Sequence, residues 1–312
     1  MITVILMALV PIFFVLLLGY FAGKYRVVNN AHVGELNTVV MTYAIPASLF
    51  VATAITPRQA MLAQWPVMVI LGGAMMLLYP LWYLLQRRVL RASASEASLQ
   101  ALTVSLPNYA AAGLPVALAL LGPGHVVPVA VAIAAGSLLP TPVTLALLEL
   151  SVVKQNGSAV IRIARAVGHA LIKPMVLGPV MGTLFSLMNW PLSPIAVASL
   201  RQIGQVAGGL ALFVTGLILS AQRFRLNWNV ALATIIANVV QPLLALAIAL
   251  VLGVSAALME ISVLMAALPC GFFGILFGSS YGLDSEESGS TVIASTVVST
   301  FTLAVAIAWL YR

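Results

Sequence analysis

The stretch SLPNYAAAGLP, Ser105 to Pro115, decides the fold, because it places two prolines, an asparagine and a glycine inside one of the most apolar parts of the chain. Pro107 lacks a backbone N–H donor and clashes with the preceding helical turn, so a helix that contains it should break. If this region lies in a membrane, lipid cannot satisfy the freed backbone groups, whereas buried protein or a cavity can. The composition of the rest of the chain decides whether that condition holds.

The composition is that of a membrane protein. Of 312 residues, 62% are hydrophobic and 7% are charged, whereas about a quarter are charged in typical globular proteins. Nine charge-free spans can each cross a bilayer as a helix, which takes roughly 20 apolar residues. They are 1–23, 36–57, 59–86, 97–148, 174–200, 202–222, 226–259, 261–283 and 288–311. Turn residues from Leu121 to Pro128 divide the span 97–148 into two crossings, so an all-α integral membrane fold with ten transmembrane helices is predicted.

The basic residues indicate the orientation. On alternate loops, Arg58, Arg201 and Arg312 fall on one side and the other eleven Lys and Arg on the opposite side. Cytoplasmic loops carry an excess of Lys and Arg. We therefore predict a multi-pass protein of the plasma (inner) membrane with both termini on the non-cytoplasmic side. The net charge of +7 is spread over loops rather than gathered on one soluble face, so no nucleic-acid partner is expected.

An internal repeat accompanies this topology. Ten helices with both ends on one side divide into two halves of five, and an odd number per half requires the halves to be inverted. A shift of 162 or 163 positions aligns Trp65 with Trp228 and Leu106-Pro107 with Leu268-Pro269. Inverted repeats of this kind are typical of secondary transporters, which bind substrate near the membrane midplane.

The repeat defines three regions. They are a first five-helix repeat over 1–150, a cytoplasmic connector over 151–173 and a second, inverted five-helix repeat over 174–312. In the connector, Arg162, Arg165 and His169 recur at helical spacing among apolar residues. That pattern predicts an amphipathic helix lying at the membrane interface.

The second repeat contains a break that matches the first. Pro269-Cys270-Gly271 lies near the middle of the ninth predicted helix, as Pro107-Asn108 does in the fourth. A lone proline in a membrane helix is usually a packing kink. Two breaks at equivalent positions should instead meet at mid-membrane, where each following half-helix points free N–H groups and its positive dipole end into the gap. This arrangement predicts an anion site without a basic residue.

The candidate substrate-binding residues lie at the two breaks and beside Pro46. They are Pro107, Asn108, Tyr109, Ala110, Pro269, Cys270, Gly271, Tyr43 and Ser48. Asn238 and Gln241 precede Pro242 and are expected to satisfy the backbone that this proline frees. All seven acidic residues lie near predicted membrane boundaries, which disfavours coupling through a buried carboxylate. Sodium held by backbone carbonyls, or a proton carried on the substrate, stays open; no cofactor and no protein-built metal site are expected.

Four stretches also resemble the auxin efflux carrier family. LPNYAAAGLP resembles its Leu-Pro-Asn crossing segment, and LPCGFFGILFGSSYG resembles the partner segment in helix nine. YAIPASLF and GGLALFVTGLILSAQRF resemble the second and seventh helices of bacterial members, some of which are described as malonate or dicarboxylate permeases. The resemblance covers essentially the whole chain. It implies a scaffold of helices one, two, six and seven and a mobile unit of helices three to five and eight to ten, although Cys270 departs from the first crossing, where Asn108 stands.

We therefore expect a secondary transporter that moves a small organic anion, a carboxylate, by elevator-type alternating access, with the substrate held where helices four and nine cross. Two alternatives stay open: a sodium-coupled carrier of larger amphipathic anions similar to bile-acid symporters, and a non-transporting membrane sensor. An enzyme is not expected, because no HExxH motif and no paired carboxylates at mid-depth appear. The expected partners are the anion and the lipid bilayer, and a homodimer is left open.

Overall fold

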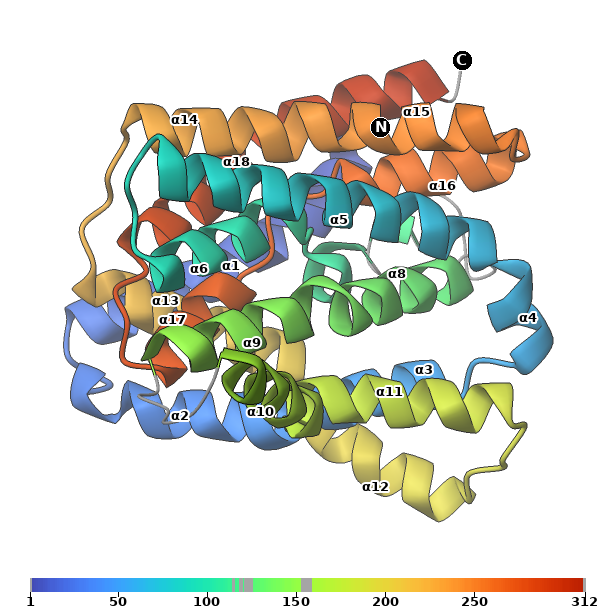
Figure 1. Ribbon diagram of the computed structural model, residues 1–312, viewed down its shortest axis with the longest axis horizontal. Helices are drawn as coiled ribbons and strands as arrows, with labels where there is room; N and C mark the ends of the chain where they lie inside the picture. Colours follow the sequence, from blue (N-terminus) through green and yellow to red (C-terminus); the bar gives the residue numbers. More distant parts are fainter. Residues whose placement is uncertain (1, 114–115, 118–119, 121–125, 153–158, 311–312) are drawn as a thin grey trace.

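The computed structural model describes residues 2–113, 116–117, 120, 126–152 and 159–310, and every regular element in these ranges is helical (Figure 1). The α-helices are α1 (Ile2–Lys24), α2 (Val33–Val39), α3 (Ile45–Ala54), α4 (Arg58–Ala63), α5 (Trp65–Arg88), α6 (Ala94–Ser105), α8 (Val126–Leu138), α9 (Pro140–Val152), α10 (Ala159–Ile172), α11 (Pro174–Leu187), α12 (Pro194–Gly204), α13 (Ala207–Ala221), α14 (Trp228–Ile235), α15 (Gln241–Leu252), α16 (Ala256–Ala266), α17 (Phe273–Ser280) and α18 (Glu286–Leu310). Shorter elements are the 3-10 turn η1 (Asn30–His32) and the π-helical turns η2 (Val40–Ala44), η3 (Tyr109–Gly113) and η5 (Ile236–Val240).

Six helical segments of the described chain are long and apolar enough to cross a membrane. They are Asn30–Ala54, Trp65–Arg88, Val127–Val152, Pro194–Ala221, Trp228–Leu252 and Glu286–Trp309. The pair Val160–Ile172 and Pro174–Leu187, bent by 66°, makes a seventh if it is counted as one span. The predicted fourth and ninth crossings are not in this group because their helices stop early, α6 at Ser105 and α16 at Ala266.

Two π-helical turns lie directly before prolines. The turn η2 precedes Pro46, at the start of α3, and η5 precedes Pro242, at the start of α15. The proline ring would clash with the carbonyl four residues earlier in a regular α-helix. A π-helical turn absorbs one extra residue and relieves that conflict without ending the span.

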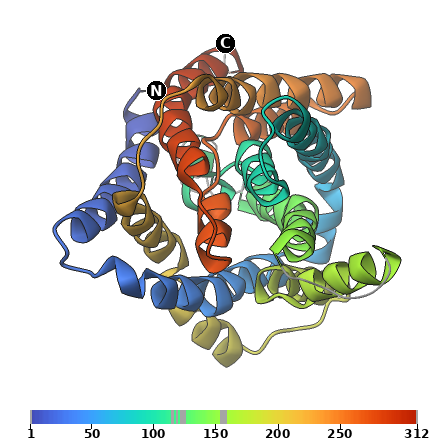
Figure 2. The same cartoon turned by 60° about the vertical axis from the view of Figure 1, so that its left-hand side comes forward.

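The helices form two groups, and α8 is one of the helices through which they touch. In the first group, α1 packs against α13, and α3 packs against α11 and α12. A Cβ atom on Gly216 of α13 would lie 2.1 Å from the carbonyl oxygen of Leu16, so glycine is what lets α1 and α13 approach closely. In the second group, α5 packs against α6, α8 and α15, and α6 packs against α9, α17 and α18. Figure 2 shows the blue and yellow segments of the first group along the left and lower rim.

The helix α8 packs against α5 of the second group and against α3 and α11 of the first. It therefore forms part of the boundary between the groups.

The turns rich in basic residues gather at one end of the molecule. Those that follow Lys24 and Arg88, and the one that contains Arg225, lie at the left of Figure 1, whereas α4, which begins with Arg58, lies at the right. This separation matches the alternation of basic residues along the sequence. The helix α10 covers most of the predicted connector.

Candidate functional site

Both predicted breaks are present. The helix α6 ends at Ser105, and Leu106 is extended with φ −107° and ψ 103° before η3 begins at Tyr109. The helix α16 ends at Ala266, and α17 begins only at Phe273. In each case a Leu-Pro pair follows the helix end, so the missing N–H and the ring of proline account for the interruption.

The two breaks are joined to each other through their backbones. The N–H of Asn108 donates to the carbonyl oxygen of Pro269 at 2.8 Å, and the N–H of Gly271 donates to the carbonyl oxygen of Leu106 at 2.8 Å. Pro107 thereby lies opposite Cys270 in a short antiparallel bridge. A Cβ atom at Gly271 would lie 2.8 Å from the Leu106 oxygen, so this approach requires glycine. Backbone groups that lipid could not satisfy are satisfied by the other break.

Polar side chains from α15 and α18 satisfy further groups at the breaks. The amide of Gln241 donates to the carbonyl oxygen of Ser105 at 2.7 Å, and the hydroxyl of Ser295 accepts from the N–H of Cys270 at 2.9 Å. Asn238 accepts from the Ser295 hydroxyl at 2.7 Å and donates to the Ser295 carbonyl at 3.2 Å.

The prediction that Asn238 and Gln241 serve the backbone around Pro242 is therefore wrong. The π-helical turn η5 accommodates that proline, which leaves the Gln241 side chain to bind α6 and the Asn238 side chain to bind α18.

The bridge also changes which donors could meet an anion. The sequence predicted that the amides following Pro107 and Pro269 would face the substrate. In the structure the first N–H after each proline is occupied, that of Asn108 by Pro269 and that of Cys270 by Ser295. These two N–H groups are therefore not available to a ligand.

Asn108 keeps such a donor. Its side chain is buried, and Oδ1 accepts from the N–H of Ala111 at 3.1 Å, which fixes the orientation of the amide. Among the described residues, Nδ2 of Asn108 has no hydrogen-bond partner. Asn108 lines a cavity of about 20 Å³ that Ser137, Gly271 and Phe272 also line. That space holds roughly one water molecule.

A larger cavity adjoins this small one. It measures about 420 Å³ and shares two lining residues with the small cavity, Leu49 of α3 and Ile133 of α8. Its walls are mostly apolar, and its charged member is Arg201 of α12. Arg201 is exposed and has no carboxylate partner among the described residues. We call this space the Arg201 vestibule.

The structure brings most predicted site residues together. Tyr109 lines the small cavity, although its hydroxyl turns toward the sulfur of Met75 at 3.9 Å. Ala110 lies in η3, and its side chain is outside the described part of the structure. Ser48 lines the Arg201 vestibule. Tyr43 stands apart: it is 61% exposed and lines a separate groove beside α11.

The sequence did not single out Ser137 or Arg201 as site residues. Arg201 was used only to infer the topology. It is far from both breaks in the sequence, so the sequence does not indicate that it lines the vestibule. Ser137 follows Gly136, where a Cβ atom would lie 2.4 Å from the Leu106 side chain. The one indication in the sequence was the pair Gly136-Ser137, a small residue next to a polar one within an apolar span.

A match to a hydrolase motif has no catalytic geometry. Gly278 to Gly282 reads GSSYG, which fits GxSxG, a motif that places serine on a strained strand-to-helix turn. Here Ser280 ends α17, and its hydroxyl donates to the Leu276 carbonyl at 3.0 Å and accepts from Asn37 at 3.1 Å. The bond from Asn37 ties α17 to α2.

Comparison with known proteins gives the family. Residues 4–307 match the family model described as "Membrane transport protein". "Uncharacterized transporter YfdV" of Escherichia coli strain K12 is 27% identical over 308 residues, which cover 95% of each chain. "Putative malonate transporter" of Rhizobium meliloti strain 1021 is 24% identical over 296 residues, 94% of this chain and 92% of its own. The chain, a membrane transporter with two joined helix breaks, therefore belongs to the membrane transport protein family, which is the family of the auxin efflux carriers.

Proposed function

We propose that this transporter carries a small organic anion, a carboxylate, and binds it between the two breaks by way of the Arg201 vestibule. One observation carries the proposal: Asn108 is held in place by its Oδ1 yet keeps a free Nδ2 beside a cavity that adjoins a vestibule with an unpaired cation. A dicarboxylate needs both features, a charge that attracts it and oriented donors that replace its water. The name of the Rhizobium relative, a putative malonate transporter, supports the choice of a malonate-like probe.

The chemistry of the small cavity fits an anion that is held by hydrogen bonds. Asn108 offers an amide donor and Ser137 a hydroxyl, and neither the small cavity nor the vestibule has a carboxylate among its lining residues. A buried site that lacks its own negative charge does not repel a carboxylate. The amide and hydroxyl donors, together with the positive charge of Arg201 at the vestibule, favour an anion over a cation.

The ten-span topology with inverted repeats belongs to this proposal, and reciprocal packing supports it. With the offset of 162 or 163, α1 corresponds to α11 and α3 to α13; α1 packs against α13 and α3 against α11. The helices α5 and α14 both begin at a tryptophan, Trp65 and Trp228. We propose repeats over 1–150 and 174–312 that are joined by the connector 151–173.

An open vestibule next to a nearly closed binding cavity fits an elevator-type cycle. The Arg201 vestibule is bordered by Thr56 and Pro57, which lie next to Arg58 on the face that the distribution of basic residues assigns to the outside. In an inner membrane with both termini outside, the vestibule opens to the non-cytoplasmic side. Leu49 belongs to the proposed scaffold and Ile133 to the mobile unit, so sliding of one past the other would enlarge the binding space.

The test uses purified protein in liposomes that are preloaded with unlabelled malonate. We expect saturable counterflow of labelled malonate, which a carrier shows and a channel does not. Asn108→Ala should weaken malonate binding by about 0.5–1.5 kcal/mol through loss of one hydrogen bond. Asn108→Asp should weaken it far more, because it sets a negative charge against the substrate.

Asn29→Asp is the matched control, since Asn29 caps η1 through its side-chain oxygen, a bond that aspartate can also make. The proposal is wrong if Asn108→Asp binds malonate as well as the parent does. Uptake of a bile acid that depends on a sodium gradient would support the symporter-like alternative. Binding without counterflow would support a sensor.

A further inference from the structure

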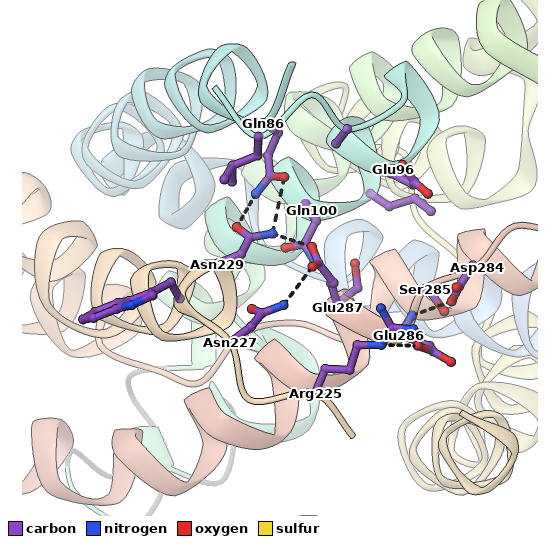
Figure 3. Close-up of a pocket in the computed structure, with 15 residues that line it drawn as sticks. Gln86, Glu96, Gln100, Arg225, Asn227, Asn229, Asp284, Ser285, Glu286 and Glu287 are labelled. Carbon is purple, nitrogen blue, oxygen red and sulfur yellow. Dashed lines mark hydrogen bonds and ion pairs between the residues drawn. The ribbon is translucent and has the colours of Figure 1, made fainter. Parts of the chain in front are cut away.

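A second large cavity lies at the opposite end of the molecule, where the helix α5 ends and the helices α6, α14 and α18 begin. It measures about 570 Å³ (Figure 3). Its lining includes Arg225, which lies on the side with the eleven basic residues, so it is separate from the Arg201 vestibule. We call it the acidic cavity because several carboxylates line it.

The acidic cavity gathers most of the negative charge of the chain. Four of the seven acidic residues line it, namely Glu96, Asp284, Glu286 and Glu287, and its one cationic lining residue is Arg225. Four carboxylates and one guanidinium give a formal charge of −3, on a chain whose net charge is +7. Helix N-termini stabilise nearby carboxylates, which explains how the four tolerate one another. Among the lining residues, Arg225 alone offsets the four carboxylates.

Asparagine amides and Arg225 hold two of these carboxylates in place. Glu287 accepts from Nδ2 of Asn227 at 3.1 Å and also from Nδ2 of Asn229, and Asn229 in turn accepts from Gln86 at 2.6 Å. Arg225 Nε lies 2.7 Å from a carboxylate oxygen of Glu286. Figure 3 shows these side chains converging from α5, α14 and α18. The wall is ordered by contacts between side chains that are far apart in the sequence.

Gln100 provides an independent sign that something binds here. Its side chain lines the acidic cavity from α6 and is 3% exposed. Both Nε2 and Oε1 are buried without a hydrogen-bond partner among the described residues. Buried amides are nearly always paired, because an unpaired donor and acceptor lose their water without compensation. An ammonium or guanidinium ligand, which donates hydrogen bonds and accepts none, would supply the partner of Oε1.

We propose that the acidic cavity binds a small organic cation, an amine or a guanidine. Ammonium and guanidinium groups make charge-assisted hydrogen bonds to carboxylates, and the volume lies within the range of roughly 300–1,000 Å³ that is usual for small-molecule sites. A metal ion fits less well, since the described residues contain no group of three or more His, Cys, Asp or Glu placed to hold one. The site requires no assumption about the transported anion.

The experiment measures binding to the purified full chain in detergent, by calorimetry and by thermal unfolding. The probes are 1,4-diaminobutane and agmatine, each compared with sodium chloride at equal ionic strength. We expect saturable heat and a rise in Tm with the amines and neither with sodium chloride. An equal rise with sodium chloride, or none with either amine, overturns the proposal. Because no transport is measured, this result is independent of the anion-carrier proposal.

Two variants separate a ligand site from a structural cluster. Glu287→Gln should weaken amine binding at least tenfold. Gln100→Leu should weaken it similarly, while the Tm of the amine-free protein stays the same or rises, because leucine removes the unpaired amide at similar size. Glu35→Gln is the control, since Glu35 is exposed on α2 and should leave amine affinity within twofold of the parent. If Gln100→Leu lowers the amine-free Tm and leaves the affinity unchanged, the amide is structural and the proposal fails.

Discussion

The side chain of Gln241 reaches from α15 to the end of α6, where its Nε2 donates to the carbonyl oxygen of Ser105 at 2.7 Å. That carbonyl would have no helical partner, because Pro107 ends the helix two residues later. One glutamine of α15 thus completes the break that follows α6.

Replacing this glutamine should destabilise the fold. Gln241→Leu keeps the side-chain size but leaves the Ser105 carbonyl buried and unpaired, which costs about 1–3 kcal/mol. Thermal unfolding in detergent measures the loss. Gln202→Leu is the control, because Gln202 is exposed on α12. Equal Tm values for Gln241→Leu and the parent would show that the bond contributes nothing.

A methyl group at Gly271 should separate the two breaks. In Gly271→Ala the new Cβ would lie 2.8 Å from the Leu106 oxygen, so the bond from the Gly271 N–H must lengthen. We expect malonate counterflow to fall at least tenfold at unchanged expression. Gly208→Ala, where nothing lies within 4 Å of the new Cβ, controls for a glycine-to-alanine change that meets no neighbour. Counterflow that survives in Gly271→Ala would mean that the bridge can relax at little cost.

Arg201 should act on substrate capture rather than on turnover. Because Arg201 is exposed, its attraction for a carboxylate is about 1 kcal/mol, so Arg201→Gln should raise KM for malonate about fivefold with kcat nearly unchanged. The difference should shrink at high salt, as screening weakens exposed charges. Arg58→Gln, on the same predicted side, is the control. A fall in kcat at constant KM would contradict the vestibule role.

Glu149 of α9 contacts α10, the residue before α11 and the end of α17. Its buried carboxylate accepts from the Tyr281 hydroxyl at 3.0 Å and lies 3.5 Å from Nζ of Lys173 and 3.8 Å from Nδ1 of His169. Glu149→Gln should lower stability by about 1–3 kcal/mol, because it removes a charged acceptor from a buried site. Thermal unfolding measures this loss. Glu260→Gln, which has no ion pair among the described residues, should leave Tm unchanged; a matching loss there would point to a general charge effect.

The orientation can be checked in intact cells. Single cysteines near Arg88 and Arg225, introduced in a Cys270→Ser background, should resist an impermeant thiol reagent applied from outside. Cysteines near Arg58 or Arg201 should react. Labelling of the first pair from outside would reverse the proposed topology.

Local chemistry explains what the sequence could predict. The helix breaks at Pro107 and Pro269 could be predicted because proline disrupts its own helix, whatever surrounds that helix. The family resemblance rests on the same segments, and the match over residues 4–307 confirms it. Charge-free spans likewise predict membrane helices because each span meets the bilayer by itself.

Pairings between distant segments could not be predicted in the same way. Gln241 looked like a partner for the neighbouring Pro242, yet it binds Ser105, because the π-helical turn had already resolved the conflict at that proline. Arg201 and Asn108 come near each other only through two cavities that share Leu49 and Ile133. Such relations depend on how helices pack, which no periodicity in the sequence encodes.

The bridge between Pro107 and Cys270 has a consequence for how such carriers diversify. Its hydrogen bonds run between main-chain atoms, so apart from the space that Gly271 provides, its strength does not depend on which side chains stand there. The residues that follow the two prolines, Asn108 in the first break and Cys270 in the second, have different side chains, yet the bridge forms. Side chains around this backbone bridge can therefore be exchanged, and binding specificity can change, while the bridge itself is kept.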